Sequence, residues 1–180
     1  MKYLLENEET ARLYFRKTNS SYFDQWLNFF EDPSSIEHWV GQYEKPSLEC
    51  EKWFDRQAAR YENDEGGMNA LIEKQSGKLV GNCGLLVQTI DQKSELEVAY
   101  SLLPFYRNKG FATEAAKKCI DFAFKNNFAE SLISIVSLTN APSANVALKN
   151  GMRIEKQTFY KENKVNIFRI TKSDWQFNKL

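Results

Sequence analysis

Residues 104–113, with the sequence Pro-Phe-Tyr-Arg-Asn-Lys-Gly-Phe-Ala-Thr, combine the residue types in this chain that are best suited to chemistry. They lie between a predicted strand and a predicted helix, where the first N–H groups of the helix have no partner within it and the helix dipole is positive. Gly110 permits unusual dihedrals and close approach, and Arg107 and Lys109 add positive charge. The segment therefore predicts a site for a phosphate or pyrophosphate group.

An isolated Arg-x-x-Gly-x-Ala pattern is also typical of an ordinary turn between a strand and a helix, in which the glycine has only a geometric role. The segment has neither the GxxxxGK[ST] pattern of many ATP sites nor the GxGxxG pattern of dinucleotide sites. The usual ATP and NAD interpretations therefore lack their motifs, and the sequence around the segment has to decide its role.

The elements that position this segment follow from hydrophobic periodicity. A helix is expected after the cap residues 19–21, a break at 32–35, a short helix at 36–43 and a longer helix from Pro46 to a stop at 63–67; later helices are expected at 110–125 and around Pro142. The predicted strands are residues 12–16, 68–74, 79–90, 95–103, 132–136, 153–160 and 165–171. This order implies a mixed sheet with helices on both faces.

Three segments, in order along the chain, resemble one family. Residues 97–115 resemble the acyl-coenzyme A pyrophosphate motif of the GNAT superfamily of N-acetyltransferases. Residues 140–152 resemble the following N-x-x-S…K-x-G-F segment, with Met152 in place of the usual Phe. Residues 9–16 are similar to the T-x-R-L-x-L-R opening of the branch that includes ribosomal-protein N-terminal (alanine/serine) acetyltransferases. Together these matches cover nearly the whole chain.

The resemblance implies a fold and a cofactor. Residues 1–180 would form a single acetyl-coenzyme A-dependent domain with the GNAT fold, an α/β (α+β) architecture with a mixed, mostly antiparallel twisted sheet of six to seven strands and helices on both faces. A central pair of parallel strands, around 97–103 and 132–138, would splay apart and hold acetyl-coenzyme A. No metal is implied.

The resemblance also implies which residues bind the cofactor. Main-chain groups of two leucines would pair with the pantetheine arm, N–H groups of the loop would hold the pyrophosphate, and an asparagine and a serine would lie near the thioester. A lysine, with Lys117 and Lys118 as alternatives, would face the outer phosphates. The implied residues are Leu102, Leu103, Arg107, Asn108, Lys109, Gly110, Phe111, Ala112, Thr113, Asn140, Ser143 and Lys149.

The implied reaction is direct attack of a neutral primary amine on the thioester carbonyl, with a thiolate leaving. Glu97 is the candidate base, and Glu95 competes because it has the same strand parity. Many family members have a tyrosine that acts as general acid seven residues after the asparagine that aligns with Asn140. Here that position is Ala147, so Ser143 or a water is the candidate acid. This departure keeps open a non-catalytic acyl-coenzyme A-binding module.

The acceptor is less determined by these motifs. A peptide or protein N-terminus is favoured because an α-amine is partly neutral at pH 7, and polyamines and amino sugars are the alternatives. Residues 1–66 carry 8 basic and 14 acidic side chains, which favours a cationic ligand, whereas residues 67–180 carry 16 and 10. Exposed aromatic residues around 26–30 would support a homodimer.

Composition excludes several other classes. The 24 basic and 24 acidic side chains of this 180-residue chain cancel, so bulk nucleic-acid binding is disfavoured. No apolar run is long enough for a membrane span and the start lacks a signal-peptide core, which predicts a cytosolic protein. Three widely spaced cysteines and a single histidine, His38, predict neither a disulfide framework nor a metal site, and His38 is expected to be structural or at the surface.

Overall fold

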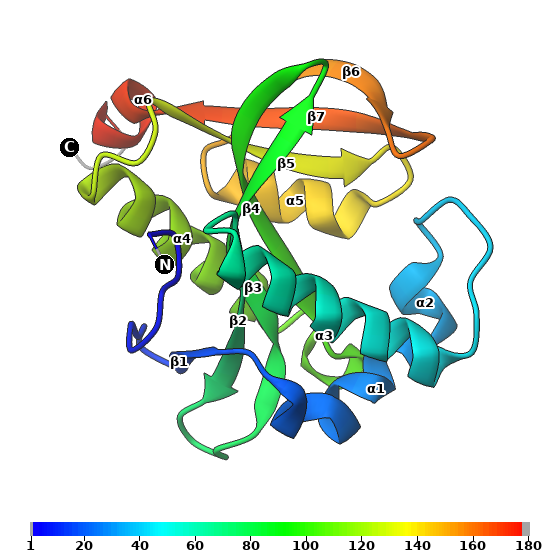
Figure 1. Ribbon diagram of the computed structural model, residues 1–180. Helices are drawn as coiled ribbons and strands as arrows, with labels where there is room; N and C mark the ends of the chain where they lie inside the picture. Colours follow the sequence, from blue (N-terminus) through cyan, green and yellow to red (C-terminus); the bar gives the residue numbers. More distant parts are fainter. Residues whose placement is uncertain (1, 178–180) are drawn as a thin grey trace.

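The computed structural model describes residues 2–177, whose strands form one seven-stranded sheet (Figure 1). In chain order the strands are β1 (Leu13–Lys17), β2 (Gly66–Glu73), β3 (Leu79–Ile90), β4 (Lys93–Leu102), β5 (Ser131–Ser137), β6 (Arg153–Tyr160) and β7 (Asn163–Thr171). Their order across the sheet is β1-β2-β3-β4-β5-β7-β6. The β4–β5 pair is parallel and the other neighbouring pairs are antiparallel. The expected mixed, mostly antiparallel sheet with a parallel pair is thus confirmed.

Helices cover both faces of the sheet. They are η1 (Ser20–Tyr22), α1 (Phe23–Glu31), α2 (Pro33–Ile36), α3 (Pro46–Glu62), η2 (Pro104–Tyr106), α4 (Phe111–Lys125), α5 (Ala141–Lys149) and α6 (Lys172–Phe177). Helix α4 buries an apolar stripe that recurs at spacings of three and four residues, which is the pattern that predicted it. Its stripe packs on β3 and β4 together with α5, whereas α1 and α3 pack on the opposite face.

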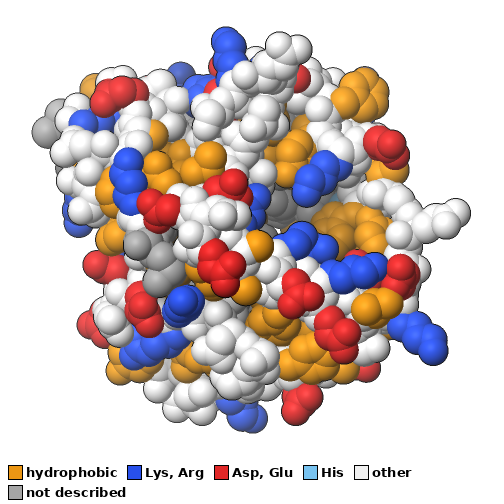
Figure 2. Space-filling view, viewed as in Figure 1, with side chains coloured by type: hydrophobic (Ala, Val, Ile, Leu, Met, Phe, Trp, Pro, Cys, Tyr) orange, Lys and Arg blue, Asp and Glu red, His pale blue; other side chains and the backbone are white. Residues whose placement is uncertain are grey.

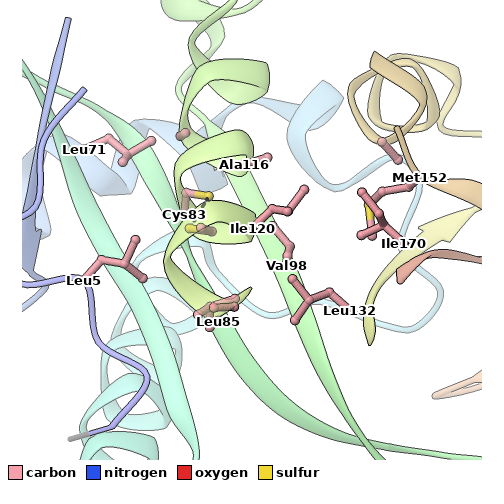
Figure 3. Packing of buried hydrophobic residues seen from close by; sticks show 14 of the residues in the cluster. Leu5, Leu71, Cys83, Leu85, Val98, Ala116, Ile120, Leu132, Met152 and Ile170 are labelled. Carbon is pink, nitrogen blue, oxygen red and sulfur yellow. Dashed lines mark hydrogen bonds between the residues drawn. The ribbon is translucent and has the colours of Figure 1, made fainter. Parts of the chain in front are cut away.

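The core on the α4 side is continuous from β1 to β7. Figure 3 shows Ile120 and Ala116 of α4 packed among Leu85, Val98 and Leu132 of the sheet. These side chains are almost fully buried, so α4 is held rigidly against the strand that precedes it. The loop between β4 and α4 is therefore fixed at both ends.

The core on the other face consists mostly of aromatic side chains. Trp26 stacks on Phe29 with ring centroids 4.5 Å apart, and Trp26 also contacts Trp53 of α3 at 5.2 Å. Trp26, Phe29 and Phe30 are only 1%, 4% and 5% exposed. The expectation that residues 26–30 expose aromatics for a homodimer is therefore wrong, because α3 covers them.

Two short helices differ from the prediction. The break expected at 32–35 is instead the start of α2, because Asp32 Oδ1 accepts a hydrogen bond from Ser34 N at 3.0 Å and Pro33 occupies the first turn. Helix α2 ends at Ile36, and 37–45 contain no helix. Helix α6 was not predicted; it is short and is held by Trp175, whose ring packs on Phe124 at 5.4 Å.

The parallel strands β4 and β5 diverge soon after they meet. Their register contains the single pair Glu97 and Ile133. Just beyond this pair, the Ser134 hydroxyl donates to Val98 O at 2.8 Å, so a side-chain hydrogen bond takes the place of the next backbone hydrogen bond between the strands. From there to Leu102, β4 pairs with β3 alone in the part of the sheet that the structure describes. The sheet therefore opens along one edge of β4.

Candidate functional site

A cleft of about 910 Å³ occupies the opening between β4 and β5. Its walls come from the ends of both strands, the start of α4, one side of α5, the segment after α2, and part of α3. In Figure 1 this region lies between α3 and α5. Figure 2 shows a hollow there, bordered by hydrophobic side chains and by Lys and Arg. Such a mixed apolar and polar lining is typical of a small-molecule site.

One end of the cleft has free backbone N–H donors. Asn108 (φ 60°) and Gly110 (φ 83°) adopt left-handed backbone, and the first turn of α4 closes with Glu114 N donating to Gly110 O at 3.1 Å. Within residues 2–177, no N–H group from 108 to 113 donates to another residue. These donors converge at the positive end of a 15-residue helix, an arrangement that suits an anion.

Two residues of the opening motif hold this loop in place. Arg12 Nε donates to Glu114 Oε2 at 2.6 Å, Arg12 Nη1 donates to Lys109 O at 2.9 Å, and Thr10 Oγ1 donates to Glu114 Oε1 at 2.6 Å. The Arg12 guanidinium also lies 4.3 Å from the ring centroid of Phe111. Although burial opposes it, these hydrogen bonds hold the pKa of Glu114 below its usual value. Thr10 and Arg12 therefore connect β1 to the loop.

The two cations of the loop do not extend into its N–H cradle. The N–H of Arg107 donates to Pro104 O at 3.2 Å, and its guanidinium donates to Ser34 Oγ at 2.7 Å and pairs with Asp32 at 3.4 Å. Arg107 therefore links the loop to α2, and it also lines the cleft. Lys109 Nζ lies 3.8 Å from the ring centroid of Phe105. The cradle is thus formed by the backbone of 108–113.

The structure brings most, but not all, of the other expected cofactor residues to the cleft. Leu102, Asn108, Gly110, Ala112, Thr113, Asn140, Ser143 and Lys149 line it. Leu103, Lys109 and Phe111 do not; Leu103 N donates to Val80 O at 3.0 Å and its side chain joins the α1–α3 core. Asn140 also caps α5, since its Oδ1 accepts from Ser143 N at 3.0 Å. Lys118 pairs with Glu8 at 2.5 Å.

Glu97 lies at the buried floor of the cleft and is 7% exposed. Burial raises the pKa of its carboxyl group, and a hydrogen bond from Gln88 Nε2 to Oε2 at 2.7 Å opposes the rise, as do the charges of Arg60 and Lys161. Gln88 Oε1 in turn accepts from Tyr160 Oη at 2.9 Å and from Arg60 at 3.3 Å. These two donors orient the Gln88 amide so that its nitrogen faces Glu97.

Glu95 shares the strand parity of Glu97 but lies outside the cleft. Its carboxylate pairs with Arg169 of β7 through hydrogen bonds of 2.8 and 3.0 Å. These hydrogen bonds lower the pKa of Glu95. Of the two carboxylates that the strand parity left open, Glu97 is therefore the one that faces the cleft.

Tyr100 is a cleft residue that sequence reasoning missed. Its hydroxyl donates to Ser143 O at 2.8 Å, and Ser143 Oγ donates to Tyr100 Oη at 3.3 Å. Burial raises the pKa of the phenol, so the phenol stays protonated. Ala147, where the family places a tyrosine, is 1% exposed and packs in the core. The available signal was the expected splaying of the strands around 97–103 and 132–138, which lets residues of both parities on the first strand reach the opening.

His38 links two walls of the cleft. Its Nδ1 lies 3.0 Å from Thr139 Oγ1, and its backbone O accepts from Asn163 Nδ2 at 2.9 Å. These contacts hold the segment after α2 against the β5 side. Among residues 2–177, no set of three or more His, Cys, Asp and Glu side chains could hold a metal ion. No helix in that range combines the length and apolar character needed to cross a bilayer.

Comparisons with known proteins agree with this geometry. A model of the acetyltransferase (GNAT) domain matches residues 12–153. The uncharacterized protein YkkB of Bacillus subtilis (strain 168) is 29% identical over 138 residues, which are 75% of this chain and 77% of YkkB. An uncharacterized N-acetyltransferase, p20 of Bacillus licheniformis, is 28% identical over 159 residues, or 85% and 84% of the two chains.

Solved structures share the fold. A putative ribosomal-protein-serine acetyltransferase from Vibrio cholerae superposes with a TM-score of 0.74 at 19% identity, over 91% of this chain and 95% of that one. The ribosomal α-N-protein acetyltransferase RimL in complex with coenzyme A gives 0.71 at 11%, over 92% and 97%. A spermidine N-acetyltransferase chimera from Vibrio cholerae and hSSAT gives 0.71 at 14%, over 92% and 99%.

Proposed function

Because the chain belongs to the GNAT acetyltransferase family and is therefore an acyltransferase, we propose that it transfers an acetyl group from acetyl-coenzyme A to a primary amine by direct attack in a ternary complex. The observation that carries this proposal is the opening between β4 and β5. It joins a cradle of free N–H donors at one end to the buried carboxylate of Glu97 at the other. Residues 1–180 would act as one domain, because every strand joins one sheet in the described range.

The residues present fit acetyl-coenzyme A, which supplies the activated thioester when bound. The unpartnered N–H groups of 108–113 suit the pyrophosphate, and Lys149 at the edge of the cleft suits an outer phosphate. The edge of β4 that β5 leaves beyond Val98 offers peptide groups to the amides of the pantetheine arm. A solved relative of this fold, RimL, has been crystallised with coenzyme A, which supports the same site here.

Glu97 is the proposed base. An amine with a pKa near 10.4 costs about 4.6 kcal/mol to deprotonate at pH 7, whereas an α-amine near 7.8 costs about 1 kcal/mol. The raised pKa of Glu97 brings it closer to that of the amine, so the carboxylate accepts a proton more readily than an exposed one. Gln88 keeps the ionised form available through its hydrogen bond of 2.7 Å.

Tyr100 is the proposed acid, with Ser143 orienting it. The phenol is protonated at neutral pH and its oxygen is held by Ser143 at the cleft wall. It can therefore donate its proton to the departing thiolate. A phenol in this place supports the enzyme over the alternative of a non-catalytic acyl-coenzyme A-binding module.

A peptide or protein α-amine is the proposed acceptor, with polyamines and amino sugars as alternatives. Neighbours with this fold include enzymes titled for ribosomal proteins and one titled for spermidine, so the fold does not select among them. A cytosolic location also stays a prediction.

A test combines binding with turnover. Acetyl-coenzyme A should raise the melting temperature, and thiol release should be measured with a panel of peptides, spermidine and glucosamine. Absence of any thermal shift at millimolar acetyl-coenzyme A contradicts the proposal. A shift without turnover of any amine would favour the binding module.

A further inference from the structure

Two cations of the cleft wall, Arg56 and Lys161, and a third beside them, Arg60, have no carboxylate partner within residues 2–177. Arg60 donates only to neutral acceptors, Glu65 O and Val87 O at 3.2 and 3.1 Å and the amide oxygen of Gln88 at 3.3 Å. Arg56 and Lys161 both line the cleft, and in the described range no hydrogen bond or ion pair engages either side chain. Arg56 and Lys161 thus present two positive charges to the cleft with no acidic side chain bound to either, whereas Arg60 is not part of the cleft lining and is connected to Glu97 through the Gln88 amide.

These charges lie close enough to influence one another. Partial burial and the neighbouring charges of Arg56 and Arg60 lower the pKa of Lys161, while the charge of Glu97 opposes the shift. Mutual repulsion of this kind disfavours the neighbouring cations, and the charge of Glu97 offsets part of it. A bound anionic group would relieve it.

The acids on the same wall are already engaged. Glu49 Oε1 lies 3.7 Å from Lys52 Nζ and accepts from Glu44 N at 3.3 Å. Glu37 Oε1 lies 3.4 Å from His38 Nε2. Glu97 is bonded to Gln88. Because Glu97 is the proposed base, the charges on this side of the cleft that have no paired side chain and no part in proton transfer are those of Arg56 and Lys161.

The position of these cations separates them from the phosphate cradle. Arg60 and Tyr160, the residue before Lys161, both donate to the Gln88 amide that holds Glu97, at the end of the cleft where β4 still pairs with β5. Arg56 lies one turn before Arg60 on the same face of α3. The cradle begins after Leu102, five residues further along β4, which is about 17 Å in an extended strand. The cations therefore lie at the acceptor end and not at the cofactor phosphates.

We propose that Arg56 and Lys161 form a subsite for a carboxylate on the acceptor, so that the amine acetylated by this enzyme belongs to a molecule that also carries a carboxylate. This inference rests on the proposed function. The carboxylate has two possible sources with the same chemistry: the α-carboxylate of a free amino acid, or an acidic side chain early in a peptide. The same charges disfavour a polyamine, in contrast to the expectation drawn from the acidic sum of residues 1–66.

The test compares acceptors that differ only in the carboxylate. Peptides beginning Ala-Glu and Ala-Gln form one pair, alanine and alaninamide form the other, and spermidine is a fifth acceptor. Because alaninamide has the less basic amine, a preference for alanine does not arise from amine protonation. We expect kcat/KM to be at least tenfold higher for the acidic member of one pair, and the pair that shows it identifies the source. Equal kcat/KM within both pairs, after division by the neutral fraction of each amine, or a preference for spermidine, overturns the subsite.

Charge variants test the residues. Arg56→Gln and Lys161→Gln should each lower the acidic-to-neutral preference about tenfold, and salt should weaken the preference in the parent enzyme. The control is Lys78→Gln, an exposed cation in the turn between β2 and β3, which should leave the preference unchanged. An unchanged preference in both cleft variants overturns the assignment.

A binding arm separates this proposal from the proposed function. If acetyl-coenzyme A raises the melting temperature but no acceptor is turned over, calorimetry in the presence of coenzyme A still tests the subsite. It compares the N-acetylated Ala-Glu peptide with the N-acetylated Ala-Gln peptide, and N-acetylalanine with its amide. Tighter binding of an acidic product supports it and equal binding within both pairs overturns it. If acetyl-coenzyme A gives no thermal shift, the proposed function fails, and the subsite fails with it.

Discussion

Gly110→Glu tests the phosphate cradle most directly. Gly110 is the residue before α4, at φ +83°, and a Cβ there would meet only Arg12 Nη2, at 3.3 Å. That guanidinium is already held by Glu114 at 2.6 Å, so it does not neutralise a new carboxylate. The variant therefore adds a negative charge where the cofactor's pyrophosphate is proposed to bind.

The size of the effect follows from Coulomb's law. A carboxylate about 5 Å from one phosphate charge costs about 3.3 kcal/mol at an effective dielectric constant of about 20. This weakens binding by about 200-fold. At an acetyl-coenzyme A concentration of 100 times the parent's Kd, the ligand stabilises the parent by about 2.7 kcal/mol, which raises its melting temperature by about 8 °C. The same concentration should raise the melting temperature of the variant by less than about 1 °C.

Gly77→Glu provides a matched control. Gly77 lies in the turn between β2 and β3 at φ +68°, with nothing within 4 Å of the position of a Cβ. Both variants place a side chain in left-handed backbone, which costs about 1–2 kcal/mol, or about 3–6 °C without ligand. Gly77→Glu should keep the parent's response to the cofactor. If the folded Gly110→Glu protein binds acetyl-coenzyme A as tightly as Gly77→Glu does, the loop is an ordinary turn.

The remaining predictions concern the acid and base. Glu97→Gln should lower kcat/KM about 10²- to 10³-fold. Burial raises the pKa of Glu97, so the folded parent loses stability as the pH rises through that pKa and the carboxyl group ionises. The variant should therefore have a higher melting temperature than the parent at pH 8, and the difference should shrink as the pH falls. A parent that melts higher at pH 8 contradicts this. Gln88→Leu removes the donor at 2.7 Å and should move the rise of kcat/KM with pH to higher pH, and an unchanged pH profile would exclude that role. Tyr100→Phe keeps the ring but loses the hydrogen bond to Ser143, so we expect at least a tenfold lower kcat with a stability loss of about 1 kcal/mol; full activity would transfer the acid role to Ser143 or water.

The sequence alone determined the parts of this protein that depend on contiguous residues. The cradle at 108–113 was visible because a strand, a glycine and a helix start follow one another directly, and the first N–H groups of a helix are free wherever a helix begins. The order of elements gave the mixed sheet, since hydrophobic periodicity is a local property. The short helices were misjudged: a proline both ends one helix and opens the next at Asp32–Ser35, the helix expected at 36–43 ends at Ile36, and α6 was not predicted.

Tertiary structure decided which of two equivalent side chains reaches the site. Glu95 and Glu97 have the same parity on one strand, and only the partners on neighbouring strands, Arg169 for one and Gln88 for the other, distinguish them. The family resemblance pointed to position 147 for an acid tyrosine, where this chain has Ala. Tyr100 instead provides a phenol in the cleft and bonds Ser143 where β5 diverges from β4. The charge summed over residues 1–66 favours a cationic acceptor, whereas the proposed subsite at Arg56 and Lys161 favours an acceptor with a carboxylate. The sign of a cleft depends on which charges are neutralised by partners, and partners come from distant parts of the sequence.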